Sequence, residues 1–207
     1  EVLVDGVNVK ELSFDALYDK LGYVTQKAVL FSGTVRDNIF FGRSAQPETE
    51  DTLSQALSLS QAAEFVSKYA EKAAHPIAQL GRNVSGGQKQ RLSIARALAR
   101  KPEILVFDDS FSALDYRTDA ALREGLMKGL PEATKIIVAQ RISTIRHADC
   151  ILVLDRGTAV GMGTHDELMK TCGVYREIAM SQLSAEELAE GGNARCETTG
   201  SPGRRAM

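Results

Sequence analysis

The sequence predicts a mixed α/β fold with a parallel sheet, and three stretches carry this prediction. Residues 104–107 are four consecutive apolar residues, the pattern of a short strand buried on both faces, which is typical of parallel sheets. Upstream of this strand, apolar residues recur at helical spacing after Ser85 until Pro102 ends the helix. Residues 1–9 alternate around an Asp-Gly pair and predict an antiparallel β-hairpin.

The composition is that of an ordinary globular domain. The 207 residues suffice for one substantial core, or for a core with a small subdomain, and 43% of them are hydrophobic. The net charge of −2 gives no reason to expect nucleic acid as a partner. No apolar run approaches the roughly 18 residues that span a bilayer, so any membrane attachment is expected to lie in another segment. Neither a disulfide framework nor a zinc site is indicated by the three widely spaced cysteines, Cys150, Cys172 and Cys196.

The rest of the chain is predicted as alternating helices and strands. Helices are indicated by apolar residues at helical spacing after a capping serine or threonine, and strands by short apolar runs between turn residues. We expect helices at 13–20, 49–72, 117–128 and 174–183 and one opening at the capping box Thr164–Glu167, and strands at 22–25, 134–139, 150–155 and 158–163, the last two joined by a turn at 156–157.

The start of the helix after Ser85 has the residue types of an anion site. Glycines let backbone N–H groups approach an anion closely, a hydroxyl adds a donor, and the helix dipole adds positive potential. Taken alone, a Ser-Gly-Gly tripeptide is more often an ordinary turn. A phosphate site at Ser85, Gly86, Gly87 and Gln88 is the alternative, and this turn by itself does not decide between the two.

Two carboxylates, Asp108 and Asp109, follow the strand at 104–107. At the carboxyl end of a parallel strand, paired carboxylates suit a hydrated magnesium ion and an attacking water. Taken alone, such a pair is often only part of a solvated loop. The weight comes from finding it directly after the glycine-led helix.

The combination closely resembles the ATP-binding cassette (ABC) family. The matching motifs are a signature loop ending in residues 85–88, a Walker B strand ending in Asp108, and a D-loop at residues 112–115. The resemblance implies a P-loop NTPase (RecA-like) parallel-sheet core with a helical subdomain at about 43–100 and part of an antiparallel β subdomain. Residues 1–183 are then a partial nucleotide-binding domain, and 184–207, which have little apolar surface, a disordered tail.

The resemblance also implies cofactors and partners, namely ATP and Mg²⁺, a second ABC nucleotide-binding domain and a transmembrane domain. In this family the signature loop closes over ATP held by a partner domain, so function implies a dimer. Gln26 occupies the Q-loop position, which together with Asp108 is a magnesium ligand, and Asp115 is a further nucleotide-binding residue. Residues 31–42 resemble exporters, which implies a position at the cytoplasmic face of the plasma (inner) membrane through a transmembrane domain not in this chain.

Two features depart from the family pattern. The phosphate loop, GxxxxGK[ST], is absent from the sequence, and residue 1 is not methionine, so we expect the chain to be truncated at its N-terminus and hydrolysis by the isolated chain to be absent. The catalytic positions hold Asp109 instead of glutamate, set back by about 1.5 Å, and Gln140 instead of histidine. Both changes fall at one site and resemble the degenerate half of a heterodimeric exporter.

Two other functions remain open at this stage. The chain could be a non-catalytic regulatory or docking module that acts on a complete ABC partner, because only the signature half of the machinery is whole. A DNA-repair ATPase is disfavoured by the short segment between Gln26 and Ser85, which has no coiled coil, and by the near-neutral charge. The transported substrate is open, since peptides, lipids and drugs all fit.

Overall fold

The computed structural model describes residues 1–42, 44 and 46–182, so the tail expected at 184–207 lies outside the described residues. The described chain forms two compact units, which divide between Gln140 and Arg141. Among the described residues, no helix has both the length and the apolar composition needed to cross a membrane.

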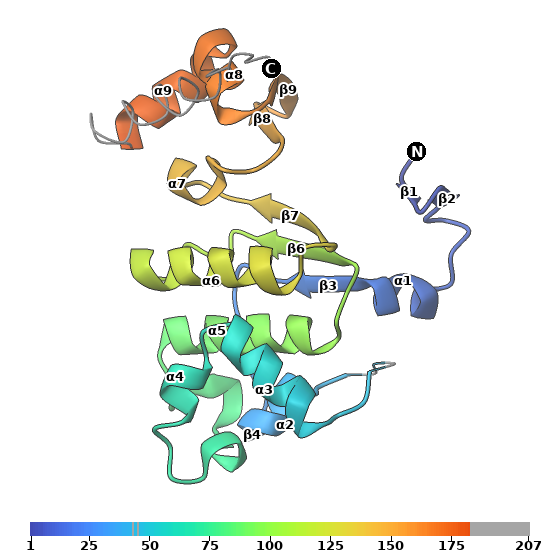
Figure 1. Cartoon of the computed structure of the whole chain (residues 1–207), viewed down its shortest axis with the longest axis vertical. Helices are drawn as coiled ribbons and strands as arrows, with labels where there is room; N and C mark the ends of the chain where they lie inside the picture. Colours follow the sequence, from blue (N-terminus) through green and yellow to red (C-terminus); the bar gives the residue numbers. More distant parts are fainter. Residues whose placement is uncertain (43, 45, 183–207) are drawn as a thin grey trace, which may run out of the picture. The chain divides into compact units, whose positions relative to one another are not determined.

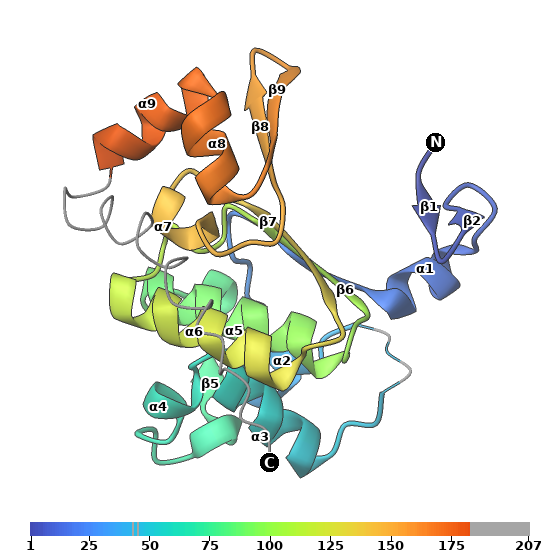
Figure 2. The same cartoon turned by 45° about the horizontal axis from the view of Figure 1, so that its top comes forward.

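The first unit is built on a parallel sheet, as predicted. Its strands β3 (Leu21–Val24), β6 (Ile104–Asp108) and β7 (Thr134–Val138) lie in the order β3-β6-β7. The chain's parts are shown in Figure 1, and Figure 2 shows helices α5 (Gly86–Ala99) and α6 (Tyr116–Gly129) on one side of this sheet. The core between them contains fully buried side chains from both layers, namely Val24, Leu92, Ala95, Leu105, Phe107 and Leu122.

The other face of the sheet is open, which corrects one prediction. The strand at 104–107 was predicted to be buried on both faces, but only Leu105 and Phe107 are buried, and their neighbours along the strand are partly exposed. The reason is that the described helices α5 and α6 cover only one face. Tyr23, Ile136 and Val138 consequently remain about half exposed, at 52%, 51% and 51%.

A mainly helical segment separates β3 from α5. It contains α2 (Val35–Ile39), α3 (Glu50–Leu59), α4 (Ala63–Val66), two 3-10 turns, η1 (Lys72–Ala74) and η2 (Gln79–Gly81), and the pair β4 (Gly33–Thr34) and β5 (Pro76–Ile77).

The prediction of a single helix at 49–72 is wrong, because the segment contains a break. Helix α3 ends at Leu59, because Ser60 hydrogen-bonds back to the Leu57 carbonyl and Gln61 adopts a left-handed backbone with φ of 59°. The chain then turns into the short helix α4. The apolar spacing continues across this break, which is why the pattern alone predicted one helix.

The N-terminal elements follow the sequence predictions. Strands β1 (Leu3–Val4) and β2 (Val7–Asn8) pair in antiparallel fashion through a turn in which Asp5 and Gly6 both have positive φ, the geometry that favours an Asp-Gly pair. Helix α1 (Phe14–Lys20) begins at Ser13, whose side chain accepts a hydrogen bond from a backbone N–H of the first turn.

The second unit packs a hairpin on two helices. It contains α7 (Ile142–Ile145), β8 (Ile151–Asp155), β9 (Thr158–Gly163), α8 (His165–Thr171) and α9 (Gly173–Gln182). The turn at 156–157 and the capping box of Thr164 and Glu167 are confirmed. Its core includes Ile151, Val153, Leu168, Tyr175 and Ala179.

Candidate nucleotide site

The sheet ends in a group of polar side chains centred on Asp109. This residue follows β6 with a left-handed backbone, φ of 43°, and its N–H donates to the Val138 carbonyl at 2.9 Å. Such a backbone is strained for a residue with a β-carbon, so the surrounding contacts have to hold it. The carboxylate of Asp109 is thereby fixed at the carboxyl edge of the sheet.

Three residues predicted from separate stretches of sequence meet at this carboxylate. The Gln26 side-chain amide donates to Asp109 Oδ2 at 3.1 Å, and the Gln140 amide donates to the same oxygen at 3.1 Å. Gln26 follows β3 and Gln140 lies just after β7, so all three positions sit where parallel strands end. The structure thus joins both predicted catalytic residues and one predicted magnesium ligand in one hydrogen-bonded group.

Asp108 has a partner that sequence reasoning missed. The Tyr23 hydroxyl donates to Asp108 Oδ2 at 3.0 Å, and this hydrogen bond, more than burial, raises the pKa of Tyr23. Tyr23 pairs with Val106 in the sheet register, two positions before Asp108 on the same face. That register could be inferred only once β3 and β6 were known to be neighbours.

The oxygen donors of this edge fit magnesium. Asp108 and Asp109 offer carboxylate oxygens, and Gln26 uses its NH₂ group for Asp109, so its amide oxygen is not consumed by that bond. Among the described residues, no three or more His, Cys, Asp or Glu side chains are placed so that they could hold a metal ion together. Mg²⁺ commonly takes one or two carboxylates and completes its shell with water and phosphate oxygens, and this donor set matches that pattern.

The predicted phosphate site occupies the N-terminus of α5. Ser85 is the N-cap: its Oγ accepts from the Gln88 N–H at 3.3 Å, and its own N–H donates to Gln88 Oε1 at 2.9 Å. This capping box was missed at the sequence level, although the Ser-x-x-Gln spacing signals it. It fixes the first turn of α5, which is exposed at Ser85 and Gly86.

Contacts within this chain do not explain why residues 86 and 87 are glycines. Both have negative φ; a methyl group on Gly86 would meet nothing within 4 Å, and one on Gly87 would lie 3.5 Å from the Ala113 carbonyl, an ordinary contact. Glycine is therefore not needed for packing or backbone strain at either position. Their effect is to leave the N–H end of α5 open to an external group.

Asp115 is placed at the N-terminus of α6, where it is the N-cap. Its carboxylate accepts from Thr118 N at 2.9 Å and from Thr118 Oγ1 at 2.8 Å, and these hydrogen bonds lower the pKa of Asp115. The exposed side chain therefore has a structural task in this chain, in addition to the nucleotide-binding role predicted for it.

Comparison with known proteins finds relatives that match most of this chain. A family profile described as "ABC transporter" matches residues 1–112. An uncharacterized ABC transporter ATP-binding protein of Mycobacterium bovis is 47% identical over 186 residues, which is 89% of this chain and 32% of that protein. A putative ABC transporter ATP-binding protein of Mycoplasma genitalium is 41% identical, over 88% of this chain and 30% of its own length.

A solved structure agrees with these relatives. A bacterial Atm1-family ABC exporter with ATP bound superposes with a TM-score of 0.82 and 34% identity, over 88% of this chain and 32% of that one. Multidrug resistance protein 1 of Entamoeba histolytica is 39% identical over 90% of this chain and 14% of its own length. The chain therefore spans about a third or less of each of these four proteins.

Proposed function

The chain belongs to the ABC transporter family, and from this membership we propose that it is the ATP-binding part of an exporter whose own nucleotide site is degenerate. ABC domains bind ATP, typically with Mg²⁺, and are generally ATPases that work with transmembrane domains. On this proposal, residues 1–183 are a partial nucleotide-binding domain with its helical subdomain at about 43–100. It would lie at the cytoplasmic face of the plasma (inner) membrane, joined to a transmembrane domain outside this chain.

The observation that supports a degenerate site is that two side-chain amides donate hydrogen bonds to Asp109. A general base needs a free oxygen within reach of the attacking water, and because Asp109 Oδ2 accepts from both Gln26 and Gln140, only Oδ1 of this carboxylate is left for that task. Aspartate is also shorter than the glutamate of the family pattern, and Gln140 has no titratable ring nitrogen. Losing a positioned base costs about 10²- to 10⁴-fold in rate, so this site would bind ATP with little turnover.

The signature turn supports a role at a partner's site. Its capping box is formed, its helix is regular, and Gly86 leaves the N–H end of α5 open. Mg²⁺, when bound, would neutralise phosphate charge, and Asp108 with Gln26 would hold it. Ser85, Gly86, Gly87, Gln88 and Asp115 would instead face ATP held by a second cassette, so the competent unit is a heterodimer.

ATP hydrolysis by the assembled transporter tests this function. The full polypeptide that contains this chain is produced with its partner cassette, and Ser85→Arg is introduced. The bulky cation should block closure over the partner's ATP and abolish hydrolysis. Unaltered hydrolysis would contradict the catalytic role of the signature and favour a regulatory or docking module.

A second arm tests the degenerate site. With the partner's general base removed, the remaining hydrolysis reports this chain's own site and should be low. Asp109→Glu combined with Gln140→His should then raise it about 10²-fold. Hydrolysis at this chain's site as fast as at the partner's, before any substitution, would overturn the degenerate assignment.

A further inference from the structure

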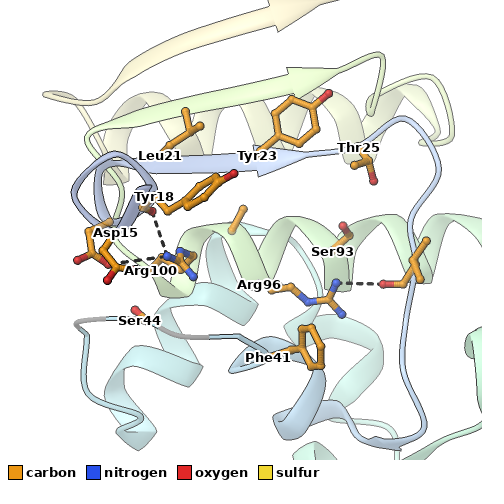
Figure 3. A pocket seen from close by; sticks show the side chains of 13 residues that line it. Asp15, Tyr18, Leu21, Tyr23, Thr25, Phe41, Ser44, Ser93, Arg96 and Arg100 are labelled. Carbon is orange, nitrogen blue, oxygen red and sulfur yellow. Dashed lines mark hydrogen bonds and ion pairs between the residues drawn. The ribbon is translucent and has the colours of Figure 1, made fainter. Parts of the chain in front are cut away.

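Arg96, in the middle of α5, holds the loop that carries Gln26. Its Nε and one terminal nitrogen donate to the carbonyl and side-chain oxygens of Asn38, at 2.7 and 3.1 Å, and the other terminal nitrogen donates to the Val29 carbonyl at 3.0 Å. These partners lie 58 and 67 residues away in sequence. Figure 3 shows the guanidinium beside the Phe41 ring, at the wall of a cavity of about 730 Å³.

The surroundings of Arg96 contain aromatic rings but no balancing charge. Its guanidinium carbon lies 5.4 Å from the Phe31 ring centre and 5.6 Å from that of Phe41, and the two rings stack on each other at 4.0 Å. In the described part of the chain, no carboxylate forms an ion pair with it. Partial burial of a cation without a counter-ion is costly, so three neutral acceptors arranged for a planar fork are the reason for arginine here.

Asn38 connects Arg96 to the following part of the loop, at Phe31 and Thr34. It is almost fully buried, at 1% exposure, and exchanges hydrogen bonds with the backbone N–H and C=O of Phe31 at 2.8 and 2.9 Å. A further bond runs from its amide to the Thr34 carbonyl at 2.9 Å. Arg96 therefore contacts a loop that is already tied together by a buried amide.

Gln90, also on α5, holds the other end of the same loop. It is 1% exposed, and its amide donates to the Thr25 carbonyl at 3.3 Å, directly before Gln26. The helix thus binds the backbone on both sides of Gln26, at residues 25 and 29. It also packs closely on β3, since a methyl group on Gly22 would lie 3.3 Å from the Ala97 carbonyl.

We propose that Arg96 and Gln90 are positioning residues that couple Gln26, at this chain's own nucleotide site, to the signature turn at the start of the same helix. The inference rests on the proposed function. Since Ser85 begins the helix that grips both sides of Gln26, a displacement of the Gln26 loop moves the signature turn with it. The nucleotide state of one site is thereby communicated to the other through α5.

A double-mutant cycle tests whether Arg96 acts through Gln26. In the full polypeptide assembled with its partner, Arg96→Met should lower kcat for ATP about tenfold with little change in KM, and Arg96→Lys should not restore it, because an ammonium cannot reproduce the fork. In the Gln26→Ala background, Arg96→Met should add less than about a twofold further loss. Multiplicative losses, or rescue by lysine, would overturn the proposal.

Arg91→Met is the matched control. Arg91 also lies on α5 and binds a carbonyl, that of Gln61 at 2.9 Å, but it stacks on Phe65 and makes none of the contacts described at residues 25–29. Its effect on kcat should therefore multiply with that of Gln26→Ala. A general loss of packing in α5 would make both arginine variants behave alike, which would contradict a specific role for Arg96.

Backbone hydrogen exchange gives a readout that does not depend on activity. Arg96→Met should speed exchange in residues 26–31 of the full polypeptide at least about tenfold, and Arg91→Met should leave it unchanged. Unchanged exchange in Arg96→Met would overturn the inference even if the transporter is active. The two proposals can fail separately. If Ser85→Arg leaves ATP hydrolysis unaltered while Arg96→Met still speeds exchange, the proposed function is wrong but Arg96 does hold the loop.

Discussion

Gly86 is a residue whose identity is explained by what lies outside its own chain. It occupies the first turn of α5, has an ordinary helical backbone, and has free space where a side chain would point. Alanine should be preferred there on helix propensity alone. The cost of keeping a glycine points to a group that approaches the helix end.

Gly86→Ala should accordingly separate stability from activity. We expect the free energy of unfolding to rise by up to about 1 kcal/mol, because alanine loses less backbone entropy, and ATP hydrolysis in the assembled pair to fall. Thermal unfolding and ATPase assays of the full polypeptide measure both. Gly125→Ala in α6, where a methyl group would make only ordinary contacts beyond 3.5 Å, is the control that should change stability alone. Full activity in Gly86→Ala would show that the open helix end is not used.

At the scale of single elements, local signals predicted the structure well and long-range contacts escaped prediction. The hairpin at 1–9 and the caps at Ser13 and Thr164 are set by turn and capping chemistry within a few residues. The break after α3 depends on Gln61 adopting a left-handed backbone, for which its sequence gives no signal.

The candidate site shows the same division. Gln26, Asp109 and Gln140 were singled out by the resemblance to the ABC family, and they meet because each follows a strand and parallel strands bring their ends together. The contacts of Tyr23 and Arg96 could not, since they depend on sheet register and on side chains about 60 or more residues apart. Periodicity locates a helix but does not say which loop its polar side chains will hold.

The pair of helices α8 and α9 should be sensitive to acid. His165 Nδ1 and the Tyr175 hydroxyl lie 2.8 Å apart and buried, and desolvation is the main cause that lowers the pKa of His165 below its usual 6.5; Arg146 and His147 lower it further, and Asp166 opposes them. The unfolded chain then binds this proton more readily than the folded one. The histidine's contribution is present above pH 6.5 and is lost as the pH falls below that value towards its folded pKa.

Urea unfolding, monitored by backbone hydrogen exchange in residues 165–182, should therefore show a lower midpoint urea concentration at pH 5 than at pH 7.5. His165→Gln keeps a polar side chain without a titratable ring, so its midpoint should change less between the two conditions. An equal acid shift in both proteins would assign the effect to other groups.

At the scale of the whole molecule, one apolar face of the parallel sheet is not covered by any described helix. In the first unit this face is formed by Tyr23, Ile136 and Val138, on a sheet in which β7 is an edge strand within the described residues. A groove of about 930 Å³, lined in part by Leu3, Val106 and Ile136, borders it. Parallel sheets are normally covered on both faces, and an open face with a free edge favours association between chains.

The 207-residue chain on its own should consequently self-associate as its concentration rises. Placing lysine at both Ile136 and Val138 should shift sedimentation towards monomer, because two charges would have to be desolvated at the contact. Met127→Lys is a matched control: Met127 is at least as accessible, at 64% exposure, but it lies on α6 on the covered side of the sheet. A purely monomeric wild-type chain at high concentration, or an equal effect of all the lysines, would show that the open face does not drive association.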